Sequence, residues 1–505
     1  MAVGKVWLVG AGPGDPGLIT VRGLEALRSA DAVLYDALAH PALLDECPQA
    51  DKRNVGKCYG GASATQEAIC AQLIELARSG KTVVRLKGGD PLLFARGAEE
   101  AEVLRAAEIP FEIVPGVPSP TAAAAYAGIS LTHRELSSST TFITGSDRAG
   151  KEWSPEAWKK LATATDTICV LMGMRRIEEI TQAIIDGGRA ASTPAAVIQW
   201  GTRPEQRVLV ATLGDIAARA RAEGLSNPAI IVVGEVVRLR ETLRWFDNRP
   251  LFGKRILIPR PPHQAGATAE AIRERSAEPI AFPVIEIMDP PDPQPLRDAI
   301  ARLADYAWVL FTSANGVDRF FAALHDAGRD ARALGNARVG VIGPKTGHAL
   351  SKYGVRPDSV AKEFVGESLA QELLAASGRG KVLVPRALSA RETMPQMLRD
   401  AGFEVDVVPA YETKPVSERG AELAALLTAG AVDVILFTSG STVASTCELL
   451  GDDAAELLSR VVIASIGPIT SDAARARGLS PTVTAQVFTV DGLLDALEAH
   501  YSGAN

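Results

Sequence analysis

The second half of the chain contains two copies of one sequence pattern, and this repeat limits how the chain can fold. Three pairs of motifs lie 126 residues apart: ILIPR and VLVPR, ending at Arg260 and Arg386; FPVIEI and VPAYET, around Pro283 and Pro409; FTSANGV and FTSGSTV, starting at Phe311 and Phe437. A fourth pair, GPKTG and GPITS, begins 124 residues apart at Gly343 and Gly467. Solenoid repeats are much shorter, so this period predicts two copies of one α/β half that face each other across a ligand-binding cleft.

Length and composition indicate a globular protein of several domains. At about 150 residues per domain, a chain of 505 residues exceeds what one hydrophobic core can organise. A net charge of −7, without a Lys/Arg run interleaved with aromatic residues, argues against general nucleic-acid binding. Basic pockets for an acidic small molecule remain compatible with that charge.

The cysteines and the N-terminal residues predict a cytoplasmic protein. The five cysteines are odd in number, scattered and never spaced as CxxC, which favours reduced thiols and argues against a zinc site or a disulfide framework. The start, MAVGKVWLVGAGPGD, is unlike a signal peptide, and no uninterrupted apolar stretch reaches about 18 residues. We therefore expect neither export nor membrane insertion, and no bound metal.

Short β-branched runs alternate with helical periodicity through the first half, which is typical of an α/β fold. Strands are expected at VWLV (6–9), AVLY (32–35), TVVRL (82–86), TTFIT (140–144) and AIIVV (229–233), with a helix over QEAICAQLIELAR. The alternation lapses in a charged, aromatic stretch between Arg238 and Gly253. We place the linker at 246–252, between domains at 1–245 and 253–505.

The loop after the first strand, VGAGPGDPG, formally fits GxGxxG between Gly12 and Gly17 and raises dinucleotide binding as a hypothesis. Its two prolines remove backbone N–H groups that a pyrophosphate needs, and Asp15 adds negative charge. A tight turn is therefore favoured. Asp36 lies near the spacing expected of an acidic ribose partner, which keeps an NAD-dependent oxidoreductase open as an alternative.

The first half contains further distinctive motifs: RLKGGDPLLF, VPG, YAGISLTHRE, LMGM and NPAIIVVGEVV, with YD and VGK between the first strands. Together with GAGPGDPG they resemble uroporphyrinogen-III C-methyltransferases over nearly all of residues 1–245. The motifs occur more loosely in cobalamin-pathway methyltransferases and diphthine synthase. The resemblance implies a two-lobed α/β enzyme, with lobes at about 1–115 and 116–245, that binds S-adenosylmethionine between the lobes, usually as a homodimer.

The resemblance also implies roles for individual residues. Asp36 and Lys57 match the two residues assigned to proton transfer, which the rearranging macrocycle needs after an in-line methyl transfer. Departures from the family pattern are Pro118-Ser119, where the family has Thr-Ala, and alanines at 95 and 98 in place of glycines. The implied contacts with S-adenosylmethionine are Pro13, Gly88, Gly89, Asp90, Leu93, Met172 and Gly201.

Residues 253–500 resemble uroporphyrinogen-III synthase, through the PR, FTS, GP-x-T and YET motifs. That resemblance implies a two-lobed α/β fold, with one lobe from 253–286 plus 413–505 and another from 290–410, joined by crossing strands. It implies cyclisation of hydroxymethylbilane with inversion of the last ring and no cofactor. Tyr411 would assist departure of the hydroxyl group. The implied substrate contacts are Thr346, Ser439 and Thr470, with Arg260 and Arg386 either as carboxylate partners or in surface ion pairs.

The sequence thus predicts an α/β protein with a two-lobed tetrapyrrole methyltransferase fold followed by a two-lobed synthase fold. Our first hypothesis is a bifunctional enzyme that makes uroporphyrinogen III and methylates it to precorrin-2. The alternative keeps the methyltransferase but makes the second half a non-catalytic tetrapyrrole-binding module. In both cases the partners are small tetrapyrroles, with no nucleic acid and no membrane.

Overall fold

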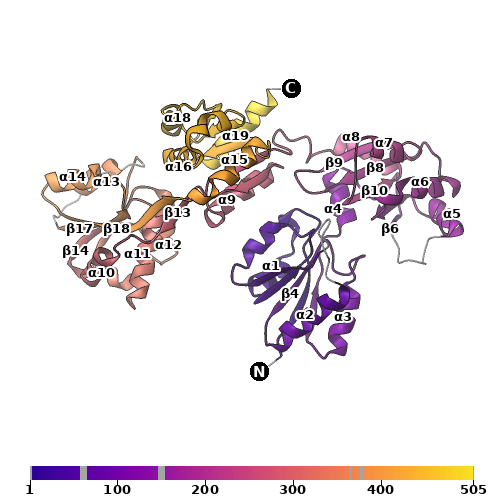
Figure 1. The fold of residues 1–505 in the computed structure, drawn as a ribbon, viewed down its shortest axis with the longest axis horizontal. Helices are drawn as coiled ribbons and strands as arrows, with labels where there is room; N and C mark the ends of the chain where they lie inside the picture. Colours follow the sequence, from indigo (N-terminus) through magenta and orange to yellow (C-terminus); the bar gives the residue numbers. More distant parts are fainter. Residues whose placement is uncertain are drawn as a thin grey trace. The chain divides into compact units, whose positions relative to one another are not determined.

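The computed structural model describes residues 3–56, 65–145, 154–363, 366–375, 380–390 and 392–503 (Figure 1). The chain divides into two compact units. The N-terminal unit consists of Met1–Lys254, Ala271–Glu278 and Glu498–Asn505, and the C-terminal unit of Arg255–Glu270 and Pro279–Leu497. In the part of the chain that the structure describes, no helix is both long enough and apolar enough to cross a lipid bilayer.

The first lobe of the N-terminal unit is a parallel sheet with the strand order β3-β2-β4-β1-β5. Helix α1 packs on one face, and α2 and α3 pack on the other (Figure 1). The order differs from the 3-2-1-4-5 order of dinucleotide-binding folds, because β4 lies between β2 and β1. The elements are β1 (Val6–Gly10), α1 (Val21–Arg28), β2 (Ala32–Tyr35), β3 (Asp51–Asn54), α2 (Gln66–Arg78), β4 (Val83–Lys87), α3 (Gly97–Ala106) and β5 (Phe111–Val114).

The second lobe is a mixed sheet with the order β6-β7-β10-β8-β9, in which β6 and β7 are the one parallel pair of neighbours among the described strands. Its elements are α4 (Ser119–Tyr126), β6 (Thr140–Thr144), α5 (Pro155–Ala164), β7 (Thr167–Leu171), α6 (Ile177–Asp186), β8 (Pro194–Gln199), β9 (Arg207–Thr212), α7 (Ile216–Ala222), β10 (Ala229–Val233) and α8 (Arg240–Leu243).

The segment predicted as a linker, 246–252, is packed within the N-terminal unit. Phe246 is 4% exposed and Leu251 is fully buried. The Phe246 ring lies 4.7 Å from the ring of Tyr126 at the end of α4, and Trp245 donates a hydrogen bond to the carbonyl of Ala125. The aromatic residues that interrupt the α/β pattern therefore fasten this segment to the second lobe, although the domain boundary itself stays a prediction.

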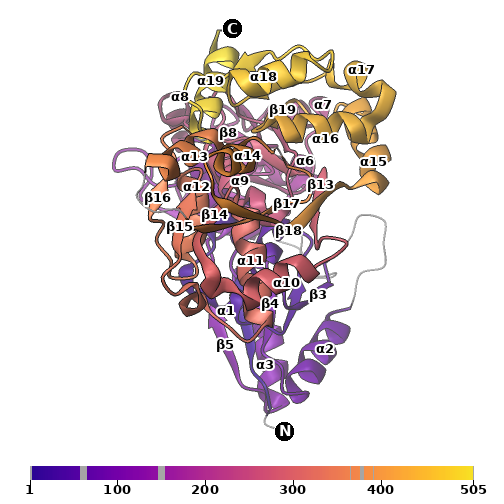
Figure 2. The same cartoon turned by 90° about the vertical axis from the view of Figure 1, so that its left-hand side faces the viewer.

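The C-terminal unit contains two sheets, and each of the five strands of one sheet has a repeat counterpart in the six-stranded other. The third lobe has the order β12-β11-β19-β20-β21, and the fourth has β13-β18-β17-β14-β15-β16, whose last five strands are the repeat counterparts in the same order. The long strand β18 pairs with β17 along its first part and with β13 along its last (Figure 2). β13 enters the fourth lobe and β18 leaves it, so each lobe combines strands from both sequence copies.

The third lobe comprises β11 (Arg255–Ile258), α9 (Pro262–Glu274), β12 (Glu278–Ala281), α15 (Gly420–Thr428), β19 (Val434–Phe437), α16 (Gly440–Leu450), α17 (Ala454–Leu458), β20 (Val462–Ser465), α18 (Pro468–Arg475), β21 (Val483–Thr484) and α19 (Val490–Ser502). The last residues of α9 and α19 and the first of β12 are counted with the N-terminal unit. The fourth comprises β13 (Ile285–Met288), α10 (Gln294–Ala301), β14 (Tyr306–Phe311), α11 (Ala314–Asp326), β15 (Arg338–Val341), α12 (Pro344–Ser351), β16 (Ser359–Val360), α13 (Gly366–Ala375), β17 (Lys381–Ala387), α14 (Thr393–Asp400) and β18 (Glu404–Pro415).

Candidate active sites

A cavity of about 600 Å³ is lined by residues of both the first and the second lobe. This volume lies within the range of small-molecule sites, about 300–1,000 Å³. Of the residues predicted to contact S-adenosylmethionine, five line it: Pro13, Gly88, Gly89, Met172 and Gly201. Ser119, at the position where the family pattern has Thr-Ala, also lines the cavity and places a hydroxyl-bearing residue there.

Close backbone contacts explain the glycines beside the cavity. Gly12 and Gly89 donate backbone hydrogen bonds to each other's carbonyls, at 3.2 and 2.8 Å. A Cβ atom on Gly116 would lie 2.3 Å from the Gly89 carbonyl oxygen, so a side chain there would force the loops apart. The carboxylate of Asp90 accepts hydrogen bonds from the N–H groups of Leu92, Leu93 and Gly116. Asp90 and Leu93 therefore belong to the framework of these loops and are not among the residues that line the cavity.

The charged residues that line the cavity are all arginines: Arg175, Arg176 and Arg203. Arg203 donates a hydrogen bond of 2.8 Å to the carbonyl of Leu38 and so joins the second lobe to the first. Its guanidinium lies over the Trp200 ring, 5.1 Å from the centroid. Arg176 forms an ion pair with Glu179, and Arg175 and Arg203 can bind a carboxylate group of a ligand.

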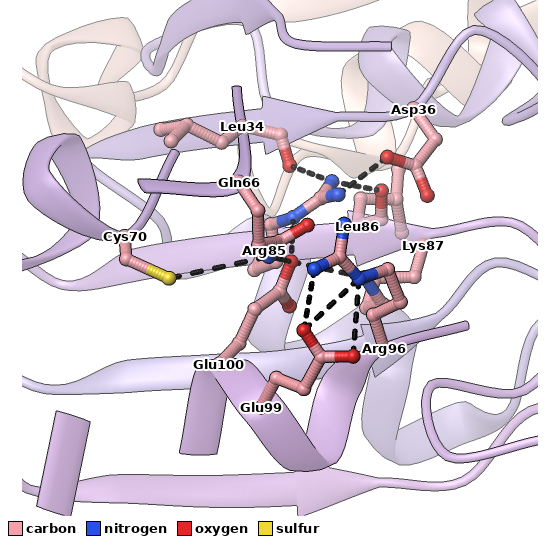
Figure 3. A network of polar contacts seen from close by, with 10 residues as sticks. All are labelled: Leu34, Asp36, Gln66, Cys70, Arg85, Leu86, Lys87, Arg96, Glu99 and Glu100. Atoms are coloured by element: carbon pink, nitrogen blue, oxygen red, sulfur yellow. Dashed lines mark hydrogen bonds and ion pairs between the residues drawn. The ribbon is translucent and has the colours of Figure 1, made fainter. Parts of the chain in front are cut away.

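Asp36 follows β2 and is held by a buried network of charges (Figure 3). Its carboxylate lies 2.5 Å from the guanidinium of Arg85 on β4, and its side chain is 28% exposed to solvent. The backbone N–H of Asp36 donates to the carbonyl of Leu86 on the same neighbouring strand. The ion pair and the backbone bond fix a partly exposed carboxylate at the carboxyl end of the parallel sheet, two residues before the cavity residue Leu38.

Glu100 on α3 is the centre of this network (Figure 3). One of its oxygens lies 3.1 Å from Arg85 and 3.0 Å from Lys87, and it also accepts a hydrogen bond from Gln66. Glu100 is fully buried, and Arg85 and Lys87 are each 2% exposed. Burial, followed by the charge of Arg85, lowers the pKa of Lys87.

In the C-terminal unit, the Tyr411 hydroxyl lies 2.9 Å from the Ser313 hydroxyl. Tyr411 is on β18 and is 7% exposed. Ser313 precedes α11 and accepts a hydrogen bond from the N–H of Gly316, which caps the helix. Burial raises the pKa of Tyr411, and hydrogen bonds with Ser313 and Asn315 oppose that rise.

The two GP-x-T loops have the same geometry. Thr346 and Thr470 lie in the first turns of α12 and α18, and each is 5% exposed. Gly343 and Gly467 precede these helices with extended backbones and without a capping side chain. Ser439 caps α16 as Ser313 caps α11. Both loops therefore present backbone N–H groups and a threonine at a helix N-terminus, which suits a carboxylate.

The two predicted arginines of this unit differ in their partners. Arg386 is 6% exposed and forms an ion pair with Glu392. Arg260 is half-buried, and burial lowers its pKa. Burial, with the charge of Arg260 nearby, also lowers the pKa of Lys345, the residue before Thr346. Among the described residues, Arg260 and Lys345 have no carboxylate within ion-pair distance, so this pair of cations is available to an acidic ligand.

Two family models match the chain. Tetrapyrrole (Corrin/Porphyrin) Methylases match residues 5–217, and Uroporphyrinogen-III synthase HemD matches residues 266–495. A curated relative, the "Porphyrin biosynthesis protein HemD" of Ruminiclostridium josui, is 40% identical over 499 residues, which cover 98% of each chain. The chain belongs to this family of fused tetrapyrrole methylases and uroporphyrinogen-III synthases. It is an enzyme of tetrapyrrole biosynthesis, with a methylase half and a synthase half.

Other relatives match a smaller share of the chain. A uroporphyrinogen-III C-methyltransferase of Bacillus subtilis is 38% identical over 378 residues, 74% of this chain and 77% of the relative. The siroheme synthase of Azotobacter vinelandii is 48% identical over 249 residues, and the match spans about half of it, 53%. Among solved structures, the uroporphyrin III C-methyl transferase of Thermus thermophilus is 37% identical with a TM-score of 0.41, covering 47% of this chain and 100% of that one.

Several cavity and network residues were not predicted from the sequence. In the methylase half these are Arg85, Glu100 and the lining arginines, and in the synthase half Ser313 as the partner of Tyr411. The sequence contained one signal of the charge network: the RLK motif places Arg85 and Lys87 in β4, a strand that is buried along its whole length. Charged residues in such a strand require buried partners. Lys57, predicted to transfer a proton, lies outside the described residues.

We expect the methylase half to lose stability as the pH falls from about 6.5 to about 4, because of His40. Burial, with a smaller contribution from the Arg203 guanidinium, lowers the pKa of His40 from 6.5 to about 4. Over that interval the unfolded chain binds a proton that the folded state does not, so the free energy of unfolding falls by up to about 3 kcal/mol. Urea unfolding at pH of about 7 and about 4.5 should show a smaller loss in His40→Gln than in the parent. Equal losses in both proteins would contradict the assignment.

Proposed function

We propose that the synthase half closes hydroxymethylbilane to uroporphyrinogen III, with inversion of the last ring and loss of water. The methylase half then methylates uroporphyrinogen III at C2 and C7 to give precorrin-2. The methyl donor is S-adenosylmethionine, and the synthase half needs no cofactor. The cavity lined only by arginines among its charged residues carries the methylase proposal, because the acceptor is rich in carboxylates.

The volume of the cavity suits a ligand of the size of S-adenosylmethionine. Gly88 has room for a ligand, since a Cβ there would contact only Leu38, at 3.3 Å. Apolar strand residues such as Ile198 and Ile230 offer a surface for a planar base, and the arginines offer partners for a carboxylate. When bound, S-adenosylmethionine supplies an electrophilic methyl group on a sulfonium. Pro13, Gly88, Gly89, Met172 and Gly201 would hold it, and Asp90 and Leu93 would hold the loops that bear these residues.

Asp36 is proposed as the base that removes a proton from the methylated ring. Its partly exposed carboxylate can accept a proton, and Arg85 fixes its direction. The proposed role of Lys57 is to return a proton or to hold a substrate carboxylate. For the methyl transfer itself, the larger part of catalysis is to hold the methyl donor and the pyrrole carbon in line, because the two would rarely meet in that geometry in solution.

In the synthase half, the proposed task is to fold a flexible octa-acid so that its ends meet. The residues proposed to bind its carboxylates are Arg260, Thr346, Ser439 and Thr470. We add Lys345, because it directly precedes Thr346 and its charge interacts with that of Arg260. Arg386 would contribute only if the substrate competes with Glu392. Tyr411 is proposed to protonate the departing hydroxyl group. The hydroxyl pair formed with Ser313 favours a catalytic synthase half over a binding module.

One assay tests both halves. Hydroxymethylbilane is supplied to the full chain without S-adenosylmethionine, and the oxidised products are separated into the uroporphyrin I and III isomers. We expect an excess of isomer III over a reaction without protein, which closes spontaneously to isomer I. Adding S-adenosylmethionine should convert isomer III to a dimethylated product. Isomer I alone would show that the second half is a binding module.

A further inference from the structure

Ser313 makes two contacts through one oxygen atom. Its Oγ accepts a hydrogen bond from the backbone N–H of Gly316 at 3.0 Å, and it lies 2.9 Å from the hydroxyl oxygen of Tyr411. The first contact caps α11 and would be satisfied by many serines. The second joins the start of α11 to the middle of β18, and nothing in helix capping requires it.

While both hydroxyls carry a proton, either can donate to the other. A serine hydroxyl has one proton and two lone pairs, and the N–H of Gly316 occupies one lone pair. Ser313 is half-buried and Asn315 also bonds to Tyr411, so the cap alone does not fix the direction. Once Tyr411 has given up its proton, Ser313 is the one of the two hydroxyls that still has a proton, and it donates to the phenolate.

We propose that Ser313 is a positioning residue that holds the Tyr411 hydroxyl in place and donates to its phenolate once Tyr411 has protonated the leaving hydroxyl of the bilane. The proposal rests on the proposed synthase function. In the step, the C–O bond of the hydroxymethyl group breaks and its electron pair leaves with the oxygen. Tyr411 transfers its proton to that oxygen, and water departs. Ser313 donates to the resulting phenolate, which regains a proton when the attacking pyrrole carbon loses one on ring closure.

The internal repeat provides a matched comparison. Ser439 is the counterpart of Ser313 and caps α16 through the N–H of Thr442, at 3.3 Å. The counterpart of Tyr411, 126 residues earlier, is Ile285, which has no hydroxyl group. The Ser439 hydroxyl lies instead 2.9 Å from that of Ser441. The cap is thus common to both copies, whereas the tyrosine contact belongs to one of them.

The test uses the full chain with four single variants, Ser313→Ala, Ser313→Thr, Ser439→Ala and Tyr411→Phe, and with the double variant that combines Ser313→Ala and Tyr411→Phe. The readout is the rate of isomer III formation as a function of pH. Loss of activity at alkaline pH should report deprotonation of Tyr411. Ser313 stabilises the phenolate, so Ser313→Ala should move this alkaline limb to higher pH and lower kcat about tenfold, with little change in KM. Ser313→Thr keeps a hydroxyl and should restore the parent profile.

Two further comparisons separate positioning from stability. Ser439→Ala removes an equivalent cap, worth about 1 kcal/mol. Because Ser439 is also a proposed substrate contact, this variant should raise KM, but it should leave the position of the alkaline limb unchanged. In the Tyr411→Phe background, Ser313→Ala should produce no further loss of kcat. Additive losses in that background, or an unmoved alkaline limb in Ser313→Ala, would overturn the positioning role while the synthase function stands. A parent chain that forms no isomer III would overturn both.

Discussion

Replacing Asp36 with asparagine is expected to slow methyl transfer to uroporphyrinogen III by about 100- to 10,000-fold, the usual contribution of a general base. Asparagine keeps the size of the side chain and an oxygen for Arg85, so the fold of the first lobe should persist. It cannot accept the proton that the methylated ring must lose. The measurement is transfer of a labelled methyl group from S-adenosylmethionine to supplied uroporphyrinogen III.

The matched control is Asp51→Asn. Asp51 is also an aspartate of the first lobe, but it is exposed on β3 and pairs with Arg53. Exposed ion pairs of this kind contribute little, so this variant should methylate at the parent rate. Isomer III formation should be unchanged in both variants. An Asp36→Asn protein that methylates as fast as Asp51→Asn would contradict the assignment of Asp36 as the base.

The strands of the methylase half could be predicted because their signal is local. AVLY was expected at 32–35 and VWLV at 6–9, and the structure has β2 at Ala32–Tyr35 and β1 at Val6–Gly10. Runs of β-branched and apolar residues between turn residues specify buried parallel strands with little help from the rest of the chain. The need for glycine at positions 88 and 89 could be predicted for a similar reason, since a loop at a strand end that closely approaches a ligand or another loop has no room for a side chain.

The repeat could be read from the sequence, but self-alignment alone did not say how its two copies divide between the lobes of the synthase half. Two copies facing each other would place one copy in each lobe. In the structure, strands from both copies build each lobe, because β13 and β18 carry the chain from one lobe to the other and back. The family resemblance implied such crossing strands. Self-alignment alone gives the same motif spacing for both arrangements, so periodicity could not distinguish them.

The charge network was beyond sequence reasoning because its members come together only through packing. Asp36, Arg85 and Glu100 lie at the end of β2, on β4 and on α3, and no fixed spacing links them. The same holds for Ser313 and Tyr411, which are 98 residues apart. A sequence indicates that a charge in a buried strand needs a partner, but the topology of the sheet decides which residue supplies it.

Replacing Glu100 with leucine is expected to lower the free energy of unfolding of the first lobe by about 3–5 kcal/mol. The side chain is fully buried, and one carboxylate oxygen is shared by Arg85, Lys87 and Gln66. Without it, Arg85 retains Asp36 as a partner, but Lys87 is left as a buried ammonium group with no ion-pair partner in the described part of the chain. The measurement is hydrogen exchange of the amides of β1 and β4, whose slowest protons report unfolding of the sheet.

Two variants show whether the uncompensated charge is the cause. Glu99→Gln alters the neighbouring carboxylate, which is about half exposed and pairs with Arg96, and should cost less than about 1 kcal/mol. Adding Lys87→Met to Glu100→Leu removes the stranded ammonium group and should recover part of the lost stability, because an apolar side chain of similar length costs nothing to bury. If the double variant were no more stable than Glu100→Leu alone, the loss would stem from packing around α3 and not from charge.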